Sequence, residues 1–157
     1  MATRICFEDD GTALGVHGAL VIAVIDAQRP FSARAARRAV DEIARMRKTT
    51  HKRELVYAYV MGEQAAVPGA EARQVLSELP EHMDVAIGVH EGSGFRASMM
   101  RAVATGIAMA SRGRVHPEIV ATIPAAAARI HARLPALTED EIVSAFERVR
   151  SVALDGF

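Results

Sequence analysis

Cysteine, aromatic residues and net charge are all scarce in this chain of 157 residues, and each scarcity excludes a class of protein. The single cysteine, Cys6, leaves no disulfide within the chain and no cysteine-based zinc site. The formal net charge is zero, so no global field attracts nucleic acid or an anionic membrane. Aromatic residues make up 4% of the sequence and tryptophan is absent, so we expect a core of aliphatic side chains and methionine.

Long apolar runs are missing as well. No window approaches the roughly 18 uninterrupted apolar residues that a membrane span needs, and the first residues lack the apolar segment of a signal peptide. Half of the residues are hydrophobic, which is ample for a packed core. Together with the single cysteine, these features predict a cytoplasmic protein without membrane contact.

Strand-like and helix-like patterns alternate along the chain. Strands are expected at residues 4–8, 14–17, 19–25, 55–61, 85–89 and 118–121, and helices at 33–47, 68–79, 95–111, 124–134 and from 138 to about 154. Ser32 is a good N-cap, Pro80 is expected to end the second helix, and Thr138 with Glu141 predicts a capping box. This order predicts an α/β fold with a mainly parallel or mixed sheet of about five strands flanked by helices.

Two parts are expected within this organisation. Residues 1–134 form the α/β domain, and residues 135–157 form an additional C-terminal helix packed on the domain or on a partner. The stripe of Ile142, Phe146, Val149 and Ala153 gives that helix one apolar face.

A glycine-rich turn, with Gly92, Ser93 and Gly94 at its centre, is the most informative local feature. It follows an apolar strand pattern and opens a long helix, and free N–H groups and the positive end of a helix dipole meet at such a place. Ser93 can cap the helix, and Arg96 could hold an oxyanion from the first turn. Phosphate or a carboxylate would fit there, although the lysine and serine or threonine of a P-loop and the third glycine of a dinucleotide fingerprint are missing. A plain strand-to-helix corner is the structural alternative.

Histidine chemistry is the next candidate. None of the six histidines has metal-ligand spacing, so no metal site is expected. His90 ends the pattern of an expected central strand, beside Glu91. Ligands bind at this end of the strands in open α/β sheets, and the two side chains could act as an acid–base pair. A buried, hydrogen-bonded histidine is the alternative. No cofactor is expected.

The first helix and its exit are rich in basic side chains. They comprise Arg29, Arg34, Arg37, Arg38, Arg45, Arg47, Lys48, Lys52 and Arg53. No aromatic residues alternate with them and the whole chain is neutral, so we expect a solvated helix face and no nucleic-acid binding.

The helix expected over residues 95–111 is apolar on more than one side. A helix with that pattern is covered on more than one side, either by the core or by another subunit. Met100, Ala104 and Ile107 are the candidate interface residues for a protein partner, which includes a second copy of the chain. Methionine suits such an adaptable contact.

The runs Glu91–Ala97 (EGSGFRA) and Arg101–Gly106 (RAVATG) carry a family resemblance. Together with the order of elements, they resemble a bacterial group of STAS-like domains (sulfate transporter and anti-sigma factor antagonist) over residues 12–134. The resemblance implies a module that binds protein partners. It also implies a phosphorylated serine after the strand that follows the first helix, but residues 60–70 contain no serine or threonine.

The sequence therefore predicts a non-catalytic regulatory or scaffolding module that binds protein partners. The alternative is a binder of a small anion or nucleotide phosphate through His90, Glu91, Gly92, Ser93, Gly94 and Arg96. An enzyme that uses His90 and Glu91 is a more distant third possibility.

Overall fold

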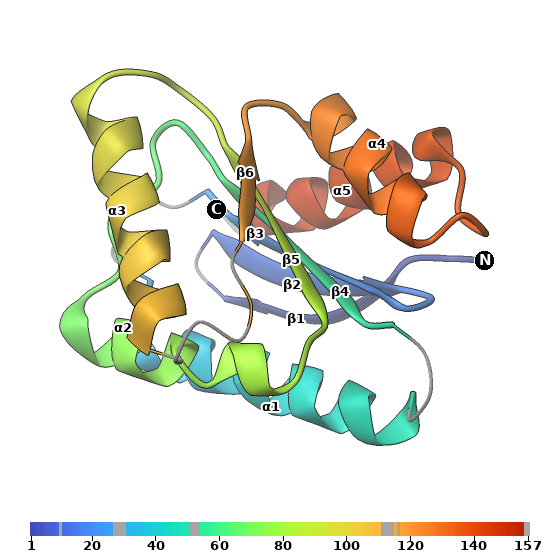
Figure 1. Cartoon of the computed structure of the whole chain (residues 1–157), viewed down its shortest axis with the longest axis horizontal. Helices are drawn as coiled ribbons and strands as arrows, with labels where there is room; N and C mark the ends of the chain where they lie inside the picture. Colours follow the sequence, from blue (N-terminus) through green and yellow to red (C-terminus); the bar gives the residue numbers. More distant parts are fainter. Residues whose placement is uncertain (10, 27–30, 51–53, 111–114, 116, 156–157) are drawn as a thin grey trace.

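The computed structural model describes residues 1–9, 11–26, 31–50, 54–110, 115 and 117–155, without the side chains of residues 95, 96, 108 and 110. One twisted sheet divides this part of the chain into two layers of helices (Figure 1).

The sheet is mixed and follows the order of the chain. Within the described residues it has six strands, in the order β1-β2-β3-β4-β5-β6, where about five were expected. The antiparallel strands are β1 (Arg4–Asp9), β2 (Thr12–His17) and β3 (Leu20–Ile25), and β4 (Val56–Met61), β5 (Val85–His90) and β6 (Glu118–Val120) continue parallel to β3. The short β6 has three residues, pairs with β5 and lies where a strand was expected at residues 118–121.

Three helices cover one face because each connects one parallel strand to the next in the same direction. They are α1 (Ala33–Thr49), α2 (Ala70–Leu76) and α3 (Phe95–Ala110). Right-handed crossovers that all step the same way place their helices on the same side of a sheet. The predicted cap of α1 is confirmed, since the Ser32 hydroxyl accepts a hydrogen bond from the Ala35 N–H (3.1 Å).

The second helix differs from the expectation. It ends at Leu76, and Pro80 lies inside a separate 3₁₀ turn, η1 (Leu79–Glu81), instead of ending the helix. Proline fits the first turn of a helix, where no N–H partner is required, so it can open a short turn as readily as it stops a longer helix.

The opposite face is covered by α4 (Ile123–Arg133) and α5 (Glu139–Asp155), which Figure 1 shows on the other side of the sheet from α1 and α2. The capping box is confirmed: Thr138 Oγ1 accepts from the Glu141 N–H (3.2 Å), and the Glu141 carboxylate accepts from the Thr138 N–H (2.8 Å). The stripe of Ile142, Phe146 and Val149 is fully buried against the strands. The C-terminal helix therefore completes the core of the sheet, since no crossover helix is available for this face.

Candidate functional site

The C-terminal ends of the parallel strands β3, β4 and β5 lie at the same level, and together they form the carboxyl edge of the sheet. In the register of the sheet, Ile25 of β3 pairs with Met61 of β4, which pairs with His90 of β5. The residues that follow these strands therefore gather at the carboxyl edge, where open α/β sheets bind their ligands.

A charged cluster occupies this edge. Arg150 of α5 donates two hydrogen bonds to the Glu91 carboxylate, one of them 3.0 Å long, and its Nε lies 3.6 Å from Oδ2 of Asp26. The hydrogen bond to Glu91 and the charges of both carboxylates raise the pKa of Arg150. Gly62 makes the arrangement possible, because a Cβ there would overlap the Asp26 carboxylate. Sequence reasoning missed Arg150 and Asp26.

His90 and Glu91 are not brought together as an acid–base pair. His90 ends β5 and Glu91 follows it. Glu91 contacts Arg150 of α5, while the Nε2 of His90 shares a hydrogen bond with the Tyr59 hydroxyl (2.9 Å). Burial, to which the positive charge of Arg101 adds, lowers the pKa of His90 to about 4. His90 is therefore neutral near pH 7.

Tyr59 reaches His90 because its cross-strand neighbour is a glycine. Tyr59 pairs with Gly88 in the register, and a Cβ at Gly88 would overlap the tyrosine ring. The ring centroids of Tyr59 and His90 lie 5.5 Å apart. Burial raises the pKa of Tyr59, so its hydroxyl stays protonated.

The glycine-rich turn has the backbone that its sequence predicts. Gly92 and Gly94 have φ values of 91° and 83°, which L side chains rarely adopt. The N-cap lies one residue after Ser93. Because α3 begins at Phe95, Gly94 occupies the N-cap, and its carbonyl accepts a hydrogen bond from the Ser98 N–H (3.1 Å). The side chain of Arg96 lies outside the described part of the chain.

A polar cavity of about 200 Å³ lies beside this turn. His90, Glu91, Gly92 and Ser93, four of the predicted site residues, line it together with residues 61–65 and with Ala97 and Met100. Two carboxylates, Glu63 and Glu91, are among its walls. Because the Glu91 carboxylate is paired with Arg150, Glu63 contributes the negative charge that disfavours an anion here.

The three predicted interface residues lie on the inner side of α3. Met100 is buried and Ala104 and Ile107 are half-buried, and all three line a second cavity, of about 100 Å³, between α3 and the sheet. This apolar cavity has Tyr57, Tyr59 and His90 on its strand side. In the single chain, these three residues therefore face the core, and other side chains of α3 face solvent.

Three of the six basic residues of α1, namely Arg37, Arg45 and Arg47, form ion pairs. Arg37 contacts Glu78 (2.6 Å), Arg45 contacts Glu42 (2.5 Å), and the Arg38 guanidinium stacks on a phenylalanine ring. The predicted basic residues Arg29, Lys52 and Arg53 lie outside the described residues. Most of the described basic side chains of α1 are exposed, as expected of a solvated helix face.

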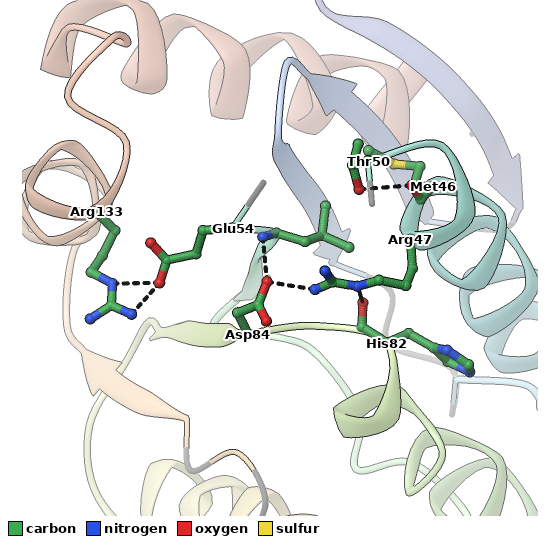
Figure 2. Close-up of polar contacts among 8 residues, drawn as sticks. Met46, Arg47, Thr50, Glu54, His82, Asp84 and Arg133 are labelled. Atoms are coloured by element: carbon green, nitrogen blue, oxygen red, sulfur yellow. Dashed lines mark hydrogen bonds and ion pairs between the residues drawn. The ribbon is translucent and has the colours of Figure 1, made fainter. Parts of the chain in front are cut away.

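Further ion pairs lie at the opposite end of the parallel strands, near the N-terminal ends of β4 and β5 (Figure 2). Arg47 of α1 donates to the Asp84 carboxylate (2.5 Å), which also accepts from the Leu55 N–H (2.7 Å). Burial would raise the pKa of Asp84, but these two hydrogen bonds outweigh it and lower the pKa. On the other side of β4, Arg133 of α4 donates to Glu54. Arg47 thereby links α1 to the residue before β5, and Arg133 links α4 to a residue shortly before β4.

The described residues contain no group of three histidine, cysteine or acidic side chains that could hold a metal ion. Likewise, none of the helices in the described ranges is long and apolar enough to cross a membrane.

Comparisons with known proteins found no matching family model, no matching curated protein and no matching solved structure.

Proposed function

We propose that this chain is a non-catalytic regulatory or scaffolding module that associates with a protein partner through the outer face of α3, and that this partner is a second copy of the chain. The observation that supports it is a stripe of apolar residues on the solvent side of that helix. Met99, Ala102, Gly106 and Met109 recur at spacings of three and four residues, and all four are exposed. We call this set the outer stripe.

Large exposed hydrophobic side chains are otherwise rare. Among the described residues there are four, and two of them, Met99 (39% exposed) and Met109 (70% exposed), belong to the outer stripe. The stripe carries no charged side chain, so two copies of it meet without charge repulsion. The small residues Ala102 and Gly106 between the methionines allow two helices to approach closely, and a two-fold contact requires such a self-complementary patch.

A groove between α2 and α3 extends the outer stripe. Its volume is about 570 Å³, and its α3 side includes Met99, Ala102 and Gly106. Its α2 side carries the polar side chains of Arg73 and Gln74. An apolar centre with a polar rim is typical of protein interfaces.

Three predictions accompany this proposal. The resemblance to STAS-like domains stays a prediction, as does the location in the cytoplasm, which is supported by the single, half-buried cysteine. Anion binding at the glycine-rich turn also stays a prediction, and the Glu63 carboxylate in the wall of the neighbouring cavity disfavours it.

Light scattering across a range of protein concentrations tests the proposal. The chain should form a dimer, and Met99→Glu should weaken it by about tenfold or more, because it places a charge at the centre of the contact. Leu154→Glu is the matched control: Leu154 is another exposed large hydrophobic residue (46%), but it lies on α5. A chain that stays monomeric, or a dimer weakened equally by both substitutions, would contradict the proposal.

A further inference from the structure

The outer stripe of α3 has nearly the same residue pattern in both directions along the helix. Met99 and Met109 lie five residues before and after residue 104, and Ala102 and Gly106 lie two residues before and after it. In an antiparallel pair of these helices, a two-fold axis at the level of residue 104 places methionine opposite methionine and small residue opposite small residue. A parallel pair also matches like residues, so other features decide the orientation.

The groove between α2 and α3 borders only part of the outer stripe. Met99, Ala102 and Gly106 belong to its described wall, whereas Met109 lies beyond it. Met109 is also the more exposed of the two methionines, at 70% against 39% for Met99. In an antiparallel pair, Met109 of the second copy lies level with Met99 and can enter the groove. In a parallel pair it meets only its own counterpart outside the groove, so the groove favours the antiparallel orientation.

The distribution of charge along α3 favours the same orientation. Its two arginines, Arg96 and Arg101, belong to its first half, and its sequence contains no acidic residue. A parallel pair would gather all the arginines of both copies at one end, beside two helix N-termini that also carry partial positive charge. An antiparallel pair places each arginine-bearing half beside the negative C-terminal half of the other helix. It also separates the two Arg101 positions by about 9 Å along the helix axis, at a rise of about 1.5 Å per residue.

We infer that two copies of the chain meet through antiparallel α3 helices, with Met99 of each copy against Met109 of the other and Ala102 against Gly106. The inference rests on the proposed function, because it specifies how the two copies of that dimer are oriented. The intervals of three, four and three residues within the stripe match the a and d positions of a coiled coil. The small residues at the centre let the two helix axes approach closely, and the methionines fill the space at both ends.

Opposite charges introduced at the two ends of the stripe test the orientation, with light scattering of the full-length chain as the measurement. Met99→Lys and Met109→Glu should each weaken the dimer by about tenfold or more, because each places a charge in an apolar contact. The double variant should dimerise about fivefold more tightly than either single variant, because an antiparallel pair brings the introduced lysine of one copy to the introduced glutamate of the other at two places.

A parallel pair would bring like charges together in the double variant. A double variant that dimerises no more tightly than the single variants would therefore overturn the inference. The unchanged chain is measured alongside: if it dimerises, that result contradicts the orientation alone, whereas a monomeric unchanged chain contradicts both the orientation and the proposed function.

Disulfide cross-linking gives an independent measurement with uncharged substitutions. Cys6→Ser first removes the single natural thiol. Under a mild thiol oxidant such as diamide, an equimolar mixture of Met99→Cys and Met109→Cys chains should cross-link faster than either variant alone. In an antiparallel pair, the two copies of one introduced thiol lie about 15 Å apart along the axis, which is beyond the reach of a disulfide. Equal or faster cross-linking of a single variant would contradict the antiparallel orientation.

Discussion

The two faces of the sheet are closed to different degrees. On the α4–α5 face, Ile142, Phe146 and Val149 are fully buried, and α5 lies so close to β2 that a Cβ at Gly15 would approach within 2.5 Å of Val149. On the other face, α1 packs closely through alanines, but the α3 end leaves an apolar cavity, a polar cavity and a groove. Among the described residues, the α4–α5 face is therefore the more tightly packed, and the free space lies at α3.

The largest expected effect compares one residue from each face. Phe146→Ala should lower the free energy of unfolding by about 3–5 kcal/mol, because it opens a cavity in a fully packed region. Ile107→Ala should cost only about 1 kcal/mol, because Ile107 is half-buried and already borders a cavity. Urea unfolding measures both values. Equal losses would show that the α3 end is packed as tightly as the α5 face.

The α4–α5 face, which we call the closed face, was easier to predict from the sequence than the α1–α3 face, which we call the open face. The helix expected from residue 138 to about 154 has the predicted capping box and the predicted buried stripe, because both are local patterns of one amphipathic helix. The strand positions follow in the same way from short apolar runs. What the pattern did not indicate is that this helix covers a face that the three crossovers leave open.

The open face and the site were harder to predict. The ion pair of Glu91 with Arg150 joins residues 59 positions apart, and no short motif signals such a contact. The proximity of Tyr59 and His90 depends on Gly88, a cross-strand neighbour whose role appears only in the register. The cavities depend on how α3 lies against the sheet, which its weakly amphipathic sequence does not specify.

A smaller expected effect is the pH dependence of stability that arises from His90, which is buried on the open face. The pKa of His90 is about 4 in the folded chain, against 6.5 ordinarily. Between these values the unfolded chain binds a proton that the folded chain excludes, so this contribution to stability is complete above about pH 7 and is lost as the pH falls towards 4. The loss should amount to about 3 kcal/mol over this range.

Urea unfolding at about pH 7.5 and pH 4.5 checks this prediction, with His90→Gln as the comparison. Carboxylates that titrate in the same range affect both proteins alike, so the wild-type chain should lose more stability on acidification than the variant. An equal loss in the two proteins would place His90 in a more open environment than its burial indicates.

The smallest expected effect tests the connection between the two faces. Arg150 belongs to the closed α5 face, but its main partner, Glu91, leads into the turn that begins α3. Arg150→Met would leave Glu91 and Asp26 without their shared cation and should cost about 1–3 kcal/mol. The side chain of Arg150 is 24% exposed, so salt should screen part of the effect.

A double-mutant cycle with Glu91→Gln separates the ion pair from the packing of the arginine stem. If the cluster holds the turn in place, the coupling energy should exceed the value of about 0.5 kcal/mol that is common for surface pairs. A coupling below that value would mean that α3 is positioned without help from α5. The stabilities of the closed and open faces would then be uncoupled at this contact, and Arg150 would not stabilise the turn that borders the polar cavity.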